Sequence, residues 1–315
     1  MRIMKSIAAT ALAALCLSAL PPAHAQTAEE QAQDEQRRIV VEGERQTNRA
    51  ARDQARELTP RAYSTSEPLP RFQADVCPGV WGLSPEFAQP MIDRIYSNAE
   101  RAGIPVNATE NCRANVWIIV VDDPQETYNS LREERSFLVR GLHPRVRREI
   151  AEEHGSTVAW HRTSMRTLEG APLVTGFEAV TANMAAISGT GAPIPSQTDR
   201  MSRTRTAIRQ DIDFAILLVE RSALADRNLF GVADFATMRL LGRARVPENE
   251  TAFSTVLAYF TDEYSADEMT MWDRAYLRSM YRGLPNRPSS QALRDLGTLM
   301  MRENEQRPDV TPVTG

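Results

Sequence analysis

The segment GVADFATMRLLGR, residues 231–243, is similar in length and position to a helix that holds a catalytic metal, but it lacks the metal ligands. Zinc hydrolysis needs two histidines one helical turn apart, so that both imidazoles face the metal, and a glutamate that activates the bound water. Ala233 and Thr237 stand at the two histidine positions, Asp234 at the glutamate position and Arg243 at that of a third ligand. We therefore expect no catalytic zinc, no other metal and no cofactor.

The order of elements around this segment resembles that of the metzincins, whose motif is HExxHxxGxxH. A predicted buried strand precedes the helix, and Leu240 takes the place of the motif glycine. STVLAYF, residues 254–260, follows where metzincins have a methionine-containing turn, with Leu257 in place of the methionine. TMWDRAYLRSMYRG, in which Thr270 is expected to cap the helix with Asp273 three residues on, resembles the closing helix of that family. The resemblance implies a zincin-like α+β fold, a mixed twisted sheet with packed helices, and a pseudo-peptidase without catalytic zinc.

Two alternatives stay open. The segment also fits an ordinary amphipathic helix of an unrelated α+β fold, with an apolar face that would contain Val232, Phe235, Ala236, Arg239 and Leu240. A periplasmic hydrolase with a non-zinc active site would use Asp122, Asp123 and His161 as acid, base or cation ligand. The competing role for the two aspartates is capping of a helix that begins at Pro124, and His143, His154 and His161 are expected at helix ends or on the surface.

The first 25 residues have the pattern of a cleaved export signal. Arg2 and Lys5 precede an apolar run that is too short to span a bilayer, and Ala23-His24-Ala25 supplies the small residues of a cleavage site before Gln26. We therefore expect a periplasmic or secreted protein with no membrane span after signal cleavage. Loss of Arg2 and Lys5 leaves 35 basic residues against 41 acidic ones, a formal charge of −6, which argues against nucleic acid as a partner.

Two cysteines remain after signal cleavage, Cys77 and Cys112. In an oxidising compartment, two cysteines most simply form one disulfide. A nucleophilic or metal-binding pair would need a nearby histidine, and the nearest one downstream is His143. The sequence favours a structural disulfide.

Residues 26–70 are dominated by Gln, Glu, Arg and Ala, a composition that indicates a disordered N-terminal arm. The arm contains one apolar island, IVVEG, which resembles the energy-coupling box of TonB-dependent outer-membrane receptors. That resemblance implies that Ile39, Val40 and Val41 form a strand that pairs with the sheet edge of an envelope protein. A chance apolar island or a strand that packs on the protein itself is the alternative.

Residues 71–285 are expected to form the metzincin-like α+β domain, followed by a C-terminal tail over residues 286–315 with room for one more exposed helix before a disordered end. Ser84, Pro85 and Gly103 mark the start and end of a helix. Apolar runs predict buried strands at 114–123 and 211–224, and alternation predicts strands at 157–167 and around 173–180. Helices are expected at 124–138, 144–154, 229–243 and 270–283. The function predicted from these features is that of an exported binding or structural protein of the cell envelope.

Overall fold

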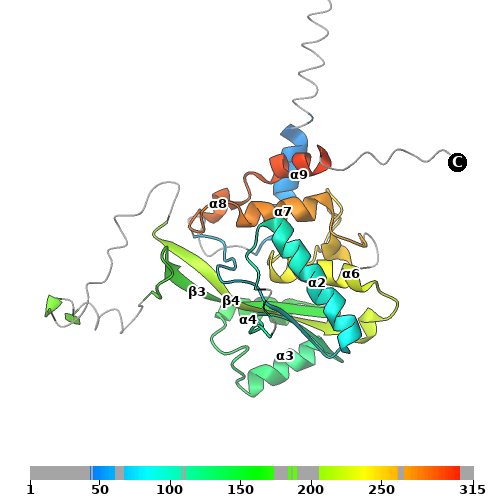
Figure 1. Ribbon diagram of the computed structural model, residues 1–315, viewed down its shortest axis with the longest axis horizontal. Helices are drawn as coiled ribbons and strands as arrows, with labels where there is room; N and C mark the ends of the chain where they lie inside the picture. The colour runs from blue at the N-terminus through cyan, green and yellow to red at the C-terminus, as the bar shows by residue number, and fades with distance from the viewer. Residues whose placement is uncertain are drawn as a thin grey trace, which may run out of the picture. The chain divides into compact units, whose positions relative to one another are not determined.

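The computed structural model describes residues 43, 45–60, 67–107, 109, 111–173, 184, 185, 187–189, 206–261 and 266–305. These residues form an α+β fold with a four-stranded mixed sheet and helices on both of its faces (Figure 1). The strands are β1 (Pro78–Trp81), β2 (Val116–Val121), β3 (Thr157–Thr167) and β4 (Ile208–Glu220). The α-helices are α2 (Pro85–Ala102), α3 (Pro124–Glu133), α4 (Pro144–Glu152), α6 (Leu229–Leu240), α7 (Met271–Tyr281), α8 (Ser289–Ala292) and α9 (Leu296–Glu305), and two short 3₁₀ helices are η2 (Ser222–Leu224) and η3 (Val256–Ala258).

The sheet has the strand order β1-β2-β4-β3, in which the first three strands are parallel and β3 is antiparallel at the edge. Side chains of β2 alternate between the two faces. Val116 and Ile118 belong to one hydrophobic cluster, and Trp117 and Ile119 pack against the other. Both faces of the sheet are covered, and β2 and the part of β4 that pairs with it over residues 215–219 consist of apolar residues, as expected for buried parallel strands.

Each face of the sheet has its own helical layer (Figure 1). The larger cluster packs between one face and helices α2, α6, α7 and α9. The smaller cluster lies on the opposite face under α3 and α4, where Tyr128 and Trp160 meet edge to face with ring centroids 5.5 Å apart. The motif helix therefore lies in the larger layer, and α3 and α4 form a separate outer layer.

Local signals in the sequence placed several element ends correctly. Gly103 ends α2 in the left-handed conformation with φ of 75°, which glycine adopts without strain. Asp123 caps α3, because its Oδ1 accepts a hydrogen bond from the Glu126 amide at 2.8 Å. The predicted disulfide between Cys77 and Cys112 is present, and it joins the residue before β1 to the segment before β2.

The predicted N-terminal arm, residues 26–70, is too long, because residues 45–58 form a helix that belongs to the core. Ala51 and Ala55 are fully buried, and the Ala51 carbonyl accepts a hydrogen bond from the Trp272 indole at 3.1 Å. The Gln54 amide exchanges two hydrogen bonds with the backbone of Phe253, at 3.0 and 2.8 Å. Composition misled the prediction. Charged and polar residues dominate the segment, but Ala51 and Ala55 lie on one face of the helix and are small enough to be buried there.

The predicted C-terminal tail, residues 286–315, is also wrong at its start. Helices α8 and α9 lie within it, and Leu296, Leu299 and Met300 are buried in the larger cluster. Asn286 is buried as well, and its amide donates a hydrogen bond to the Thr206 carbonyl at 2.6 Å. The folded domain therefore extends at least to the end of α9.

Several predictions lie outside the described residues: the export signal at residues 1–25, most of the strand around 173–180, and the pairing strand of Ile39, Val40 and Val41. Within the part of the chain that is described, no helix combines the length and apolarity needed to cross a membrane.

Replacement of Ala55 by aspartate tests the position of the helix over residues 45–58. A carboxylate at this fully buried position lacks a partner, so we expect Ala55→Asp to lower the free energy of unfolding by about 3 kcal/mol or more. The control is Arg56→Ala on the exposed side of the same helix, which loses only a surface ion pair with Asp53 and should cost less than about 0.5 kcal/mol. Urea denaturation followed by circular dichroism measures both, and equal stabilities would contradict the packing described above.

Candidate functional site

The motif helix α6 is buried on every side. All of residues 231–240 are buried, so the interpretation of this segment as an amphipathic helix is wrong. The helix begins at Asn228, whose side chain accepts a hydrogen bond from the Phe230 amide at 2.9 Å. Gly231 allows the Tyr259 ring to approach, since a Cβ atom there would lie 2.5 Å from that ring. The segment therefore forms the centre of a packed layer.

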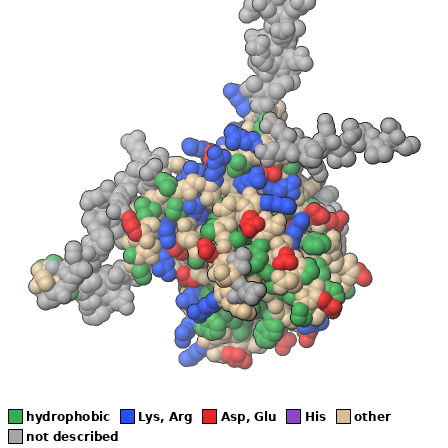
Figure 2. Space-filling view, in the orientation of Figure 1, with side chains coloured by type: hydrophobic (Ala, Val, Ile, Leu, Met, Phe, Trp, Pro, Cys, Tyr) green, Lys and Arg blue, Asp and Glu red, His purple; other side chains and the backbone are tan. Residues whose placement is uncertain are grey.

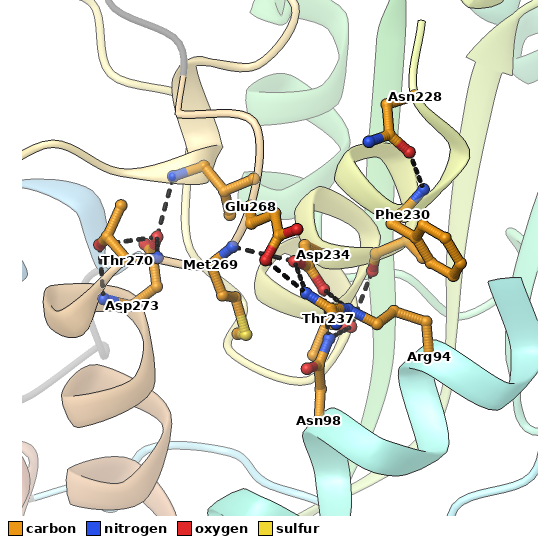
Figure 3. Close-up of polar contacts among 12 residues, drawn as sticks. Arg94, Asn98, Asn228, Phe230, Asp234, Thr237, Glu268, Met269, Thr270 and Asp273 are labelled. Carbon is orange, nitrogen blue, oxygen red and sulfur yellow. Dashed lines mark hydrogen bonds and ion pairs between the residues drawn. The ribbon is translucent and has the colours of Figure 1, made fainter. Parts of the chain in front are cut away.

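Asp234 is the centre of a buried polar network (Figure 3). Arg94 of α2 donates two hydrogen bonds, one to each carboxylate oxygen, both at 2.7 Å. Asn98, one turn further along α2, donates a third at 2.6 Å, and the Met269 amide donates a fourth at 2.9 Å. The carboxylate thus links α2, α6 and the segment before α7. Glu268 adds a weaker, exposed ion pair to Arg94 at 3.3 Å.

The positions that correspond to metal ligands are filled by packing. Ala233 and Thr237 are fully buried. The Thr237 hydroxyl donates a hydrogen bond to the Ala233 carbonyl at 2.8 Å and accepts one from Asn98 at 3.2 Å. Since Asn98 contacts both Asp234 and Thr237, α2 occupies the space in front of this turn of α6. The two side chains at the ligand positions are therefore closed to a substrate.

Arg243 lies beyond the far end of α6 and in the left-handed conformation, with φ of 52°. It lies near His161, because its charge is one cause of a lowered imidazole pKa. Burial is the largest cause of this shift, which takes the pKa of His161 well below its ordinary value of 6.5. The His161 Nε2 lies 2.9 Å from the Leu240 carbonyl, so the neutral ring donates to the end of the helix. This histidine has a structural partner.

The residues of the alternative active site do not converge. Asp122 is 94% exposed and pairs with Arg221, while Asp123 caps α3. His161 pairs in the sheet with Ala215, and Asp122 follows the end of β2, level with the end of β4 at Glu220. Five residues of strand separate these positions, or about 16 Å. The structure therefore brings no acid–base pair together here.

Asp273 is a second buried carboxylate, at the start of α7 (Figure 3). It forms the predicted capping box with Thr270, and it also accepts hydrogen bonds from the Thr255 hydroxyl at 2.6 Å and the Val256 amide at 2.9 Å. Burial raises the pKa of Asp273 above its ordinary value of 3.8, and the hydrogen bonds oppose that shift. Asp273 thus binds η3 to the start of α7.

Two hollows of the described residues are lined by no catalytic set. A cavity of about 10 Å³ adjoins the Asp234 network, which is room for one water. An open hollow of about 360 Å³ lies at the far end of β3 and is lined by Ser164, Met165, Arg166, Pro172 and Leu173, with no histidine among them. Within the described part of the chain, no three His, Cys, Asp or Glu side chains are grouped to hold a metal.

Comparisons with protein-family models, with curated proteins and with solved structures give no match for this chain. The interpretation of the site depends on the geometry described above. Sequence reasoning selected Asp234 but missed its partners Arg94 and Asn98. They lie 140 and 136 residues away along the chain, and no local pattern connects them to it.

Removal of the Asp234 carboxylate is expected to destabilise the protein strongly. Asp234→Ala leaves the partly buried Arg94 guanidinium and the Met269 amide without their acceptor, so the free energy of unfolding should fall by about 3 kcal/mol. Glu268→Gln is the control, because Glu268 is 64% exposed, and it should change stability by less than about 0.5 kcal/mol. Urea denaturation followed by tryptophan fluorescence compares them, and a stable Asp234→Ala protein would show that the network is dispensable.

The raised pKa of Asp273 predicts the direction in which the free energy of unfolding changes with pH. The folded state binds this proton more tightly than the unfolded chain, so its contribution to stability is fully present below pH 3.8 and is lost as pH rises through the raised pKa. Asp273→Asn lacks this titration. We therefore expect the wild-type protein to lose unfolding free energy relative to Asp273→Asn across that window, measured by urea denaturation at successive pH values. An opposite slope would mean that the hydrogen bonds to the carboxylate outweigh its burial.

Proposed function

We propose that the protein is an exported binding or structural protein of the cell envelope, with a metzincin-like scaffold and no catalytic zinc. One observation carries the proposal. Asp234, the acid of the motif helix, is fully buried and accepts four hydrogen bonds from protein groups. A general base must reach the proton that it abstracts, directly or through one water, and this carboxylate reaches neither. Its role in this proposal is to hold α2 and α6 together.

The same helix offers no side chain that is available to bind a metal, and this supports the proposal. Ala233 has no donor atom, and the Thr237 hydroxyl is committed to the Ala233 carbonyl and to Asn98. Zinc sites in proteins use Cys, His, Asp and Glu, and the one such residue on this part of the helix is Asp234, which faces Arg94. A metal here would have to displace an arginine from a buried ion pair.

The location and the partner of the proposed function come from the N-terminal part of the chain. Residues 1–25 have the pattern of an export signal, which would place the protein in the periplasm or outside the cell. The proposed partner is an envelope protein with an exposed sheet edge, to which Ile39, Val40 and Val41 would add a strand. Backbone groups make such pairing, so it does not require the motif helix to be accessible.

Metal content and peptide cleavage test the non-catalytic function. Protein purified without chelators should hold no stoichiometric zinc, and it should cleave no peptide in a mixed library. A chelator should leave its thermal midpoint unchanged, because metal bound only to the folded state would raise that midpoint. A zinc peptidase assayed in parallel is the positive control. Stoichiometric zinc together with chelator-sensitive cleavage would overturn the proposal.

A further inference from the structure

The segment that runs from the end of α3 into α4 carries an excess of positive charge. Residues 132–148 run from the end of α3 into α4 and contain six arginines against two glutamates, a formal charge of +4 in a chain whose net charge is −4. Five of these arginines form what we call the arginine surface: Arg132, Arg135, Arg140, Arg147 and Arg148. Basic side chains gather at the lower left of the body in Figure 2, on the side where Figure 1 draws α3 and α4.

The arginine surface has no acidic partner within the described part of the chain. None of its five guanidinium groups forms an ion pair with a described residue, whereas Arg145 of the same segment pairs with Glu149 at 2.9 Å. Elsewhere in the fold, arginines face carboxylates, as Arg94 faces Asp234 and Arg209 faces Asp211. Residues 124–152 as a whole contain six arginines and five glutamates, so the positive charge is local: from Arg135 to Arg148 the segment has five arginines and no acidic residue.

Arginines of two helices act on the same buried hydroxyl group, that of Tyr128. Tyr128 of α3 is 1% exposed, and its hydroxyl has no hydrogen-bond partner in the structure. Burial raises the pKa of Tyr128, and the charges of Arg132 and Arg147 both oppose that shift. Arg132 of α3 and Arg147 of α4 thus act on one buried hydroxyl from two helices. An anion bound on this side of the layer would be attracted by the charges of both helices.

An exposed aromatic side chain lies within the same segment. Phe137 is 63% exposed, although Val139 and Leu142 beside it are buried in the smaller cluster. The backbone here is fixed, because the Leu138 carbonyl accepts a hydrogen bond from the Trp160 indole at 3.0 Å. The turn therefore holds Phe137 outward between arginines. An apolar tip flanked by basic residues is the arrangement that binds the interface of an anionic membrane.

We propose that the arginine surface and Phe137 dock the protein on an anionic phospholipid bilayer, with the arginines on headgroup phosphates and the Phe137 ring between the headgroups. A nucleic acid would use the charge but has no need of an outward phenylalanine held by the fold. This inference goes beyond the proposed function, because the surface lies on the opposite side of the sheet from α6 and does not involve the motif helix.

Co-sedimentation with phospholipid vesicles tests the docking surface. The protein is purified from expressing cells and used without truncation. Each basic residue near an anionic bilayer contributes about fivefold to binding, so Arg147→Gln/Arg148→Gln should weaken binding to phosphatidylglycerol vesicles at least tenfold. Arg294→Gln/Arg302→Gln removes the same charge from exposed positions between α8 and α9 and on α9, and it should change binding less than about twofold. Phe137→Ala should weaken binding several-fold, and Phe87→Ala, an exposed residue on α2, should not.

Other outcomes would overturn the proposal. Equal binding to phosphatidylcholine vesicles would exclude recognition of anionic lipid, and equal loss in the Arg294→Gln/Arg302→Gln control would reduce the effect to net charge. Saturable binding of inorganic phosphate that abolishes vesicle binding would assign the surface to a soluble anion, and tighter binding to RNA would assign it to nucleic acid. A second pair, Arg135→Gln/Arg140→Gln, replaces the first if circular dichroism shows that the first fails to fold. Unchanged vesicle binding by a folded arginine variant would also refute the proposal.

Discussion

The ion pair between Asp234 and Arg94 determines how the larger helical layer packs. A carboxylate that is fully removed from water costs several kcal/mol unless charge and hydrogen bonds replace its hydration. Here both oxygens are occupied, by Arg94 and Asn98 of α2 and by the Met269 amide. Since these donors come from two segments, only one placement of α2 against α6 satisfies all of them. An apolar contact would tolerate a shift of one turn, and this network does not.

Asp273 extends the same constraint to the middle of the connection between α6 and α7. Its carboxylate holds Thr255 and Val256 at the start of η3, while Asp234 holds Met269 near the end of the connection. The two acids therefore fix the connection at two points. Acids at these positions of a metallopeptidase-like fold suggest a catalytic role. In this chain both carboxylates accept hydrogen bonds from backbone and side-chain donors of the fold.

Local patterns in the sequence predicted the fold better than the site. Alternation and apolar runs located β2 and β4, and Ser84, Gly103 and Thr270 marked helix ends, because these signals depend on neighbouring residues. The burial of α6 on all sides was missed because Asp234, Thr237 and Arg239 are polar residues that are usually exposed. Each of them is satisfied inside the protein, Arg239 by the Ala244 carbonyl and by Glu153. Partners so distant in sequence leave no periodic signal, and the alanines of residues 45–58 leave only a weak one.

The distribution of charge then bears on where this protein meets other molecules. Around α6, acids and bases are paired with one another, and the Asp234 carboxylate has no capacity left for a ligand. On the opposite face of the sheet, α3 and α4 bury only one side in the smaller cluster, and the five residues of the arginine surface form no ion pair with a described residue. A folded chain gains little from clustering like charges, since their repulsion opposes compact packing. Such a cluster is stabilised when an external anion completes it, so contact with other molecules is expected at the arginine surface rather than at the helix that resembles an active site.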